Sequence, residues 1–203
     1  MFIKFFSFFL LASHLVATEP LISSLLPRGG QLGSTQEIVI SGQRLSATEE
    51  IFFYDKGITA LDLVEDKGRK LNAKFAISAD AKIGQHELRV RTRKGLSKLF
   101  TFWVGPFPNV DEKEPNSSFE ESQPISMNVT VNGIAQNEDV DYFEVNVTEG
   151  QRISAEVEAI RLSGPLFDPY VAILDENRFE IATSDDSELL LQDSTISVIA
   201  PKT

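Results

Sequence analysis

The sequence predicts an all-β fold made of two successive β-sandwich modules, and three observations lead to this expectation. Short runs rich in β-branched and aromatic residues recur about every ten residues, without a helical period. Turn signals that contain glycine separate these runs, as in small antiparallel sandwiches. The balance of charge changes abruptly near residue 106, which indicates that the chain is divided there.

The first predicted module covers residues 18–106. Within Gln85–Thr92, Leu88 and Val90 alternate with Arg89 and Arg91, so one face is expected in the core and the other in solvent. The expected strands are Glu37–Ile40, Ile51–Tyr54, Leu61–Val64, Leu71–Ile77, Gln85–Thr92 and Leu99–Val104.

The first seventeen residues have the pattern of a secretory signal peptide. Lys4 provides the positive start, Phe5–Ala12 is an apolar run that only Ser7 interrupts, and Ala17 is a small residue suited to cleavage. The run is shorter than the roughly 20 apolar residues that a membrane-spanning helix needs. A buried terminal strand or helix is the alternative. The sequence therefore predicts a secreted protein (extracellular, periplasmic or at the cell surface) with no transmembrane segment after cleavage.

Composition excludes several functional classes. The chain has no cysteine, which rules out disulfides, thiol nucleophiles, cysteine-based zinc sites and a cysteine-linked lipid anchor. The formal net charge of -11 argues against a nucleic-acid partner, because phosphate binding needs clustered Lys and Arg.

The second predicted module is strongly acidic. Residues 18–106 hold 13 Lys and Arg against 10 Asp and Glu, whereas residues 107–203 hold 5 against 20. A polar linker is expected over residues 107–121, and the second module over residues 122–203. Its expected strands are Ile125–Val131, Tyr142–Val147, Ile153–Ala159, Tyr170–Leu174 and Ile196–Ile199.

The first module resembles an IPT/TIG-type immunoglobulin-like domain. The residues that carry the resemblance are the run from Pro20 to Pro27, Gly29, Gly30, Gly33, the run from Ile38 to Gly42, then Ala81, Gly84, His86, Leu88, Val90, Gly95, Ser97, Phe102, Val104 and Gly105. The resemblance implies an immunoglobulin-like sandwich that acts as a spacer or a binding module, without catalysis.

The second module resembles a bacterial pre-peptidase C-terminal domain. The matching residues are Glu114 to Ser118, Gly133, Asp139 to Phe143, Glu149 to Gln151, Asp168, Pro169 and Asp185 to Ser187. The resemblance implies a jelly-roll-like β-sandwich appended to secreted proteins. Members of the family continue with a turn and closing strands, so the second module is expected to be truncated, and an exposed sheet edge would then invite another chain.

Calcium is the cofactor that the acidic loops suggest, because Ca²⁺ prefers six to eight oxygen ligands from closely spaced carboxylates and amides. The run from Glu112 to Ser117 is similar to the calcium segment of the related collagen-binding domains, which carry Asp where this chain has Ser117. The expected ligands are Glu112, Glu114, Asn116, Asp139 and Asp141, with Asp185 and Asp186 as a weaker second candidate. Solvated turn residues are the alternative interpretation.

No catalytic site is predicted. His14 belongs to the leader, and His86 has no nucleophile motif near it, so a structural role is expected for it.

The sequence instead predicts a secreted, non-catalytic binding or interaction protein whose partner is a polysaccharide or a surface protein. An accessory N-terminal fragment of a larger secreted peptidase or glycosidase is the alternative, and a purely structural spacer is a third hypothesis. The cationic row Arg89, Arg91, Arg93 and Lys94 is a candidate for an anionic glycan or for a solvated face.

Overall fold

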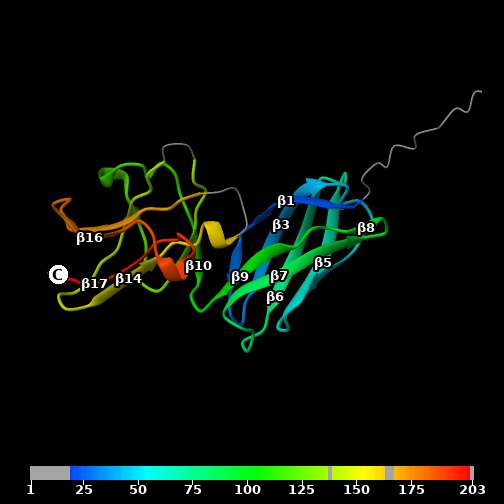
Figure 1. Ribbon diagram of the computed structural model, residues 1–203, viewed down its shortest axis with the longest axis horizontal. Helices are drawn as coiled ribbons and strands as arrows, with labels where there is room; N and C mark the ends of the chain where they lie inside the picture. The colour runs from blue at the N-terminus through cyan, green and yellow to red at the C-terminus, as the bar shows by residue number, and fades with distance from the viewer. Residues whose placement is uncertain (1–18, 137–138, 163–166, 202–203) are drawn as a thin grey trace, which may run out of the picture.

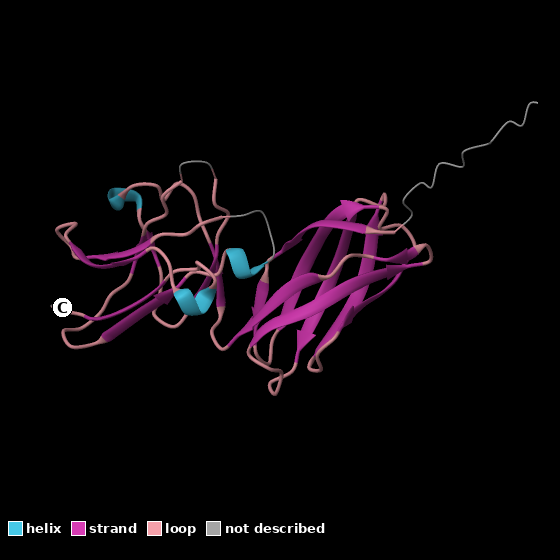
Figure 2. Cartoon of the chain, in the orientation of Figure 1, coloured by secondary structure: helices cyan, strands magenta, loops and turns pink. Residues whose placement is uncertain are grey.

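The structure, a computed structural model, describes residues 19–136, 139–162 and 167–201. These residues form β-strands and three short 3₁₀ turns, with no α-helix among them (Figures 1 and 2). The predicted all-β fold class is therefore confirmed. The predicted signal peptide, residues 1–17, lies outside the described residues.

The N-terminal half, residues 19–106, is a β-sandwich of two sheets. Both sheets are mainly antiparallel, and the chain changes sheet between β1 and β2, where Pro27 interrupts the first strand. The first sheet has the order β1 (Leu21–Leu26), β3 (Thr35–Gln43), β6 (Lys70–Ile77) and β5 (Ile58–Asp66). The second has the order β2 (Gly29–Gln31), β9 (Phe100–Gly105), β7 (Gly84–Thr92) and β4 (Thr48–Phe53), with β8 (Gly95–Leu96) beside β7.

The sandwich holds the main hydrophobic core of the molecule. Phe75 of β6 and Phe102 of β9 are fully buried and meet edge to face across the two sheets, with 5.1 Å between ring centroids. Phe53 packs on Phe75 in the same manner at 4.9 Å. Edge-to-face aromatic pairs add to the stabilisation that burial of their area provides. The alternation expected for β7 is confirmed, since Leu88 and Val90 are completely buried.

Strands β1 and β2 are absent from the sequence prediction. Pro27 and the following glycines have the character of turn residues, yet Gly29 and Gly30 pair in parallel with Trp103 and Val104. On the other side, β1 approaches β3 so closely that a Cβ on Gly42 would lie 1.9 Å from the carbonyl oxygen of Leu21. The glycine at this position lets the edge strand pair.

The C-terminal half, residues 107–201, is built from paired short strands. Two strands are much shorter than predicted. The strand expected over Ile125–Val131 is observed only over Thr130–Asn132, and the strand expected over Tyr142–Val147 only over Phe143–Glu144. The pairs are β10 (Asn109–Asp111) with β12 (Thr130–Asn132), β11 (Gln123–Pro124) with β13 (Phe143–Glu144), β14 (Arg152–Glu156) with β17 (Thr195–Ile199), and β15 (Val171–Leu174) with β16 (Glu180–Ser184). The 3₁₀ turns are η1 (Phe119–Glu121), η2 (Ile160–Leu162) and η3 (Glu188–Leu190).

This half has a sparse interior. Among its described residues, the buried apolar side chains are Ile153, Ile196 and Ala200, whereas all four residues of β15 are only half-buried. A hollow of about 3530 Å³ reaches from the junction between the halves into this region, with Trp103 and Ile173 among its lining residues. Burial of apolar area therefore stabilises the C-terminal half much less than the sandwich.

The two halves contact each other through side chains from both. Asn109 Nδ2 donates to the carbonyl oxygen of Gly29 at 2.9 Å, and Thr101 Oγ1 donates to the carbonyl oxygen of Leu162 at 2.7 Å. The stretch expected as a linker, residues 107–121, contains β10 and η1. Its boundaries as a linker remain a prediction.

Candidate metal centre

The acidic residues singled out in the sequence lie on two loops that the parallel strand pairs bring together. Glu112 and Glu114 follow β10, and Asp141 precedes β13. The N–H of Tyr142 donates to the carbonyl oxygen of Asn116 at 2.8 Å, which joins the two loops next to these side chains. Residues that are far apart in the sequence therefore converge at one end of the C-terminal half.

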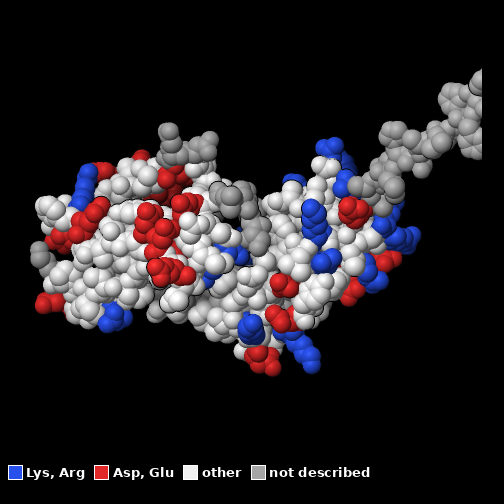
Figure 3. Space-filling model, in the orientation of Figure 1, with Lys and Arg blue, Asp and Glu red and all other residues white. Residues whose placement is uncertain are grey.

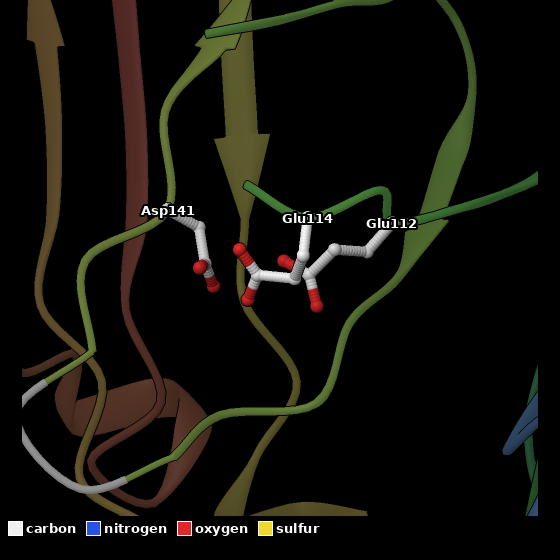
Figure 4. Close-up of side chains that lie close together, drawn as sticks. All are labelled: Glu112, Glu114 and Asp141. Carbon is white, nitrogen blue, oxygen red and sulfur yellow. The ribbon is translucent and has the colours of Figure 1, made fainter. Parts of the chain in front are cut away.

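Three carboxylates meet at this point. One oxygen from each of Glu112, Glu114 and Asp141 lies within 4.8 Å of the others. Figure 4 shows the two glutamates rising from one loop and Asp141 from the other, with their carboxyl groups turned toward each other. Like charges at this separation repel unless a cation or protons compensate them.

Asn116 provides a fourth oxygen beside this cluster. Its side chain is completely buried, and its Oδ1 has no hydrogen-bond partner among the described residues. Its Nδ2 donates to Glu112 Oε1 at 3.2 Å, and its backbone N–H donates to Glu114 Oε2 at 3.2 Å. Because a buried oxygen without a partner costs free energy, this position favours a bound ligand.

Neighbouring groups hold the first loop in place. The N–H of Ile134 donates to Glu112 Oε2 at 2.9 Å. The buried side chain of Gln123 accepts from the N–H of Lys113 at 2.8 Å and donates to the carbonyl oxygen of Asp111 at 3.1 Å. The loop conformation is thus fixed by hydrogen bonds on both sides of Glu112.

The electrostatics of the cluster are unfavourable in the absence of a cation. Burial, and then the charges of Glu112 and Asp139, raise the pKa of Asp141 to about 6. A hydrogen bond with Glu112 and the charge of Glu114 act in the same direction. Asp141 Oδ1 is buried and has no hydrogen-bond partner among the residues that the structure describes. A divalent cation would relieve both effects, because it favours the ionised carboxylate.

The remaining predicted ligands lie further from the centre. Asp139 Oδ2 accepts from the N–H of Gln136 at 3.0 Å, and Asp139 is not part of the group of three carboxylates. Asp185 and Asp186, the second candidate for a calcium site, belong to no group of three possible metal ligands among the described residues. There the carbonyl oxygen of Asp185 accepts from Ser194 Oγ.

The candidate cationic row on β7 is largely compensated by its own sandwich. Arg91 contacts Glu50 at 2.9 Å and Glu49 at 3.6 Å, and Arg93 lies 3.8 Å from Glu49. Arg89 Nη1 donates to the carbonyl oxygen of Ser97 at 3.3 Å. The charges of Arg91 and Arg93 are therefore engaged across the strands.

His86 lies inside the sandwich rather than in a site. It is completely buried, and its Nε2 lies 2.7 Å from the carbonyl oxygen of Lys82. Its Nδ1 lies 3.7 Å from an oxygen of Asp55. This environment fits the structural role expected for it.

Sequence reasoning missed a second ionic network, which lies at the junction of the halves. Asp193 is completely buried and accepts from the backbone N–H groups of Ala159 and Ile160 at 3.1 and 2.7 Å. Arg161 Nε donates to Asp193 Oδ2 at 2.7 Å, and Arg161 also contacts Glu156 at 2.6 Å. Burial raises the pKa of the nearby Glu158 to about 8. The local sequence does not predict this network, because Asp193 is 32 residues away from Arg161 in the chain.

Comparison with known proteins finds matches among solved structures. No family model matches the chain, and no curated protein matches it either. Among solved structures, it is similar to SGBP-B of the Bacteroides ovatus mixed-linkage glucan utilization locus, in complex with a mixed-linkage heptasaccharide. The TM-score is 0.36 and the identity 11%, over 93% of this chain and 37% of that one. It is also similar to the Yersinia pseudotuberculosis adhesin InvE, with a TM-score of 0.32 and 13% identity over 90% and 48%.

The chain thus spans less than half of the length of either protein. Likenesses this weak carry no argument about the fold or the function of this chain. No helical turn in the part of the chain that the structure describes is long and apolar enough to cross a bilayer.

Proposed function

We propose that this chain is an exported, non-catalytic binding protein of the cell envelope or extracellular space, whose C-terminal half binds Ca²⁺. The observation that carries the calcium proposal is the buried Oδ1 of Asn116 beside three converging carboxylates. Glu112, Glu114, Asn116 and Asp141 would hold the ion, and Asp139 would add charge from the same loop as Asp141. Carboxylate and amide oxygens are the ligands that Ca²⁺ prefers.

The export and the binding role rest on further sequence features. The apolar leader supports secretion, and the two family resemblances support an appended, non-catalytic module. The burial of His86 supports the absence of triad chemistry, since a general base must reach its nucleophile. The partner proposed is a polysaccharide or a surface protein. Binding to a glycan array or recovery of a surface protein from intact envelopes supports it, whereas blank results in both favour a structural spacer.

Thermal unfolding tests the calcium site. A ligand that binds only the folded form stabilises it by RT ln(1 + [L]/Kd), which is about 2.7 kcal/mol at a hundredfold excess over Kd. We expect millimolar Ca²⁺ to raise the melting temperature relative to chelator. Mg²⁺ should do so less, because it demands stricter octahedral geometry.

Variants separate a bound ion from general screening of an acidic protein. Glu114→Ala combined with Asp141→Ala should abolish the effect of Ca²⁺. Glu144→Ala combined with Glu188→Ala removes the same charge outside the cluster and should preserve it. Identical melting curves of the unmodified chain in Ca²⁺ and in chelator would reject the site.

A further inference from the structure

The end of the N-terminal sandwich that points away from the C-terminal half is formed by three turns. Strands β3, β5 and β7 end there, and the turns that follow them cover residues 44–47, 67–69 and 93–94. Exposed cations lie in or directly beside all three turns. Figure 3 shows blue residues at that end of the molecule, with some red residues among them. These cations are Arg44, Lys67, Arg69, Lys70, Arg93 and Lys94, and we call this end the basic tip.

Backbone hydrogen bonds join the turns into one surface. The N–H of Leu45 donates to the carbonyl oxygen of Gly68 at 3.0 Å, and the N–H of Gly42 donates to that of Arg69 at 2.8 Å. The N–H of Arg93 donates to the carbonyl oxygen of Ala47 at 3.3 Å. Leu45 is completely buried and anchors the central turn in the core. The cations are therefore displayed from a rigid base.

Two of these turns line an open hollow of about 650 Å³ on the surface. Its lining is polar and cationic: Gly42, Gln43, Arg44, Ser46, Lys67, Gly68 and Arg69. One carboxylate lies beside it, since Glu65 Oε2 accepts from the N–H of Gly68 at 3.1 Å. Gly68 is buried, and a Cβ there would lie 2.4 Å from Ser46 Oγ, so the two turns are in close contact at this point. The hollow is thus a concavity whose lining includes three cationic residues.

The cations of the hollow are not neutralised by the protein. Within the described residues, none of Arg44, Lys67 and Arg69 forms an ion pair with a carboxylate. Arg44 instead donates its Nε to the carbonyl oxygen of Glu19 at 2.8 Å, which holds its guanidinium in place. The contrast with Arg91 and Arg93, which contact Glu49 and Glu50, is clear.

The backbone around the hollow adopts unusual conformations. Arg44 and Lys67 have φ angles of 57° and 48°, in the left-handed region that residues with a side chain rarely occupy. Such conformations persist where the surrounding structure enforces them, and they gather at binding sites.

We propose that the basic tip binds an oxyanion of the phosphate or sulfate class, such as the ester groups of an anionic polymer or headgroup. Arg presents a planar fork of donors that matches such groups, and Lys adds a point charge. Ser46 and Gln43 add neutral hydrogen-bonding groups to the same lining. This inference goes beyond the proposed function, since the site lies in the N-terminal half and needs no calcium.

The first test uses inorganic sulfate and phosphate on the full chain at constant ionic strength, with chloride as the reference. We expect sulfate or phosphate to shift the amide signals of the turns at residues 44–47 and 67–69. The shifts caused by sulfate should be the same with and without Ca²⁺ in the buffer. An absence of shifts at these turns would overturn the proposal. Loss of calcium binding would leave this result unchanged, so the two proposals fail separately.

Variants show whether the hollow or the overall charge is responsible. Lys67→Asn with Arg69→Gln removes two cations of the hollow, and Asn suits the left-handed backbone at position 67. Lys56→Gln with Lys82→Gln removes the same charge from exposed turns at the opposite end of the sandwich. We expect about a tenfold or greater loss of affinity for the first pair only, because charge-assisted hydrogen bonds are the strong ones. Equal losses for both pairs would contradict a specific site.

The source of the oxyanion is distinguished with two probes. Binding to mixed phosphatidylglycerol and phosphatidylcholine vesicles, but not to pure phosphatidylcholine, supports a headgroup. Binding to dextran sulfate or linear polyphosphate supports a soluble polymer. Salt-sensitive self-association without binding to either probe would overturn the proposal, since the tip would then be occupied by the acidic half of a second copy, whose charge Figure 3 shows.

Discussion

The guanidinium of Arg161 in η2 lies over the indole of Trp103 in β9, with 5.2 Å between Cζ and the ring centroid. Trp103 belongs to the sandwich and Arg161 to the C-terminal half, so this cation–π contact joins the two. The same Arg161 pairs with the buried Asp193. One side chain therefore links the junction between the halves to the interior of the C-terminal half.

Arg161→Ala is expected to destabilise the C-terminal half and loosen the junction. Asp193 would keep its backbone donors but lose its charged partner, which costs about 1.5–3 kcal/mol for a hydrogen bond to a charged group. Differential scanning calorimetry measures the change, and small-angle scattering reports the spread of the halves. Arg178→Ala is the control, because Arg178 lies over Phe119 and pairs with Glu120 at an exposed site, worth about 0–1 kcal/mol. Equal effects of the two substitutions would contradict the role given to Arg161.

Glu158→Gln should remove a pH-dependent weakness near the same junction. Burial raises the pKa of Glu158 to about 8, and the charges of Glu156 and Asp193 add to this, while Arg161 lowers it. The protonated form is thus favoured by folding, so its contribution to stability is present below the usual carboxyl pKa and is lost as the pH rises through about 8.

Chemical denaturation across this range checks the sign of the effect. The Gln variant should match the unmodified chain near pH 5 and exceed its stability near pH 9, because an amide carries no charge to bury. Glu180→Gln, at an exposed position, is the matched control and should leave the pH profile unchanged. A Gln variant that is less stable at high pH would show that Glu158 is needed in its ionised form.

The sandwich could be predicted from sequence to a large extent, because buried and exposed residues alternate in strands such as β6 and β7 and glycine turns separate the strands. β6 and β7 follow the expected ranges within one residue. β1 and β2 were missed because Pro27 and Gly29 have turn character, and their strand state depends on tertiary pairing with β3 and β9.

The C-terminal half was predicted less well. Ile125, Met127, Val129 and Val131 alternate with polar residues as in a strand. Of the run Ile125–Val131, however, only Thr130 and Val131 lie in β12. The alternation indicates which face of a strand is apolar, but it does not show whether a neighbouring strand is available to form backbone hydrogen bonds. Here β12 is limited to the three residues that pair with β10. The carboxylates of the metal centre could be found from their spacing, whereas the burial of Asn116 could not, since it depends on how two loops meet.

The difference in packing between the halves is testable with two truncations. Phe102→Ala empties a fully buried site between the sheets and should cost about 3–5 kcal/mol. Val171→Ala, at a half-buried position in β15, should cost about 1 kcal/mol. Urea unfolding followed by circular dichroism measures both. A cost for Val171→Ala that equals the cost for Phe102→Ala would mean that the interior near β15 is as well packed as the sandwich.

The leader assignment predicts a defined mature terminus. Export should remove residues 1–17, so N-terminal sequencing of the secreted product should begin at Thr18. Ala17→Pro should block or shift the cleavage, while Ala12→Pro lies in the apolar run and serves as a comparison for export itself. Recovery of extracellular material that still carries Lys4 would contradict the signal-peptide prediction.

The affinity for Ca²⁺ should fall as the pH is lowered through about 6, the pKa to which burial and the neighbouring charges raise Asp141. Ca²⁺ binds the ionised carboxylate, so protons compete with it, and each unit of pH below this pKa should weaken binding about tenfold. Without the ion, the raised pKa means that stability is lost as the pH rises through the same range. Ca²⁺ should therefore stabilise the protein strongly near neutral pH and little near pH 4.

Calorimetric titration at several pH values measures the affinity, and buffers of different ionisation enthalpy report the released proton. Asp141→Asn should remove the pH dependence together with most of the affinity, whereas Asp186→Asn, in the acidic pair outside the cluster, should leave both intact. An affinity that is constant from pH 7.5 to pH 5 would show that Asp141 is not a ligand.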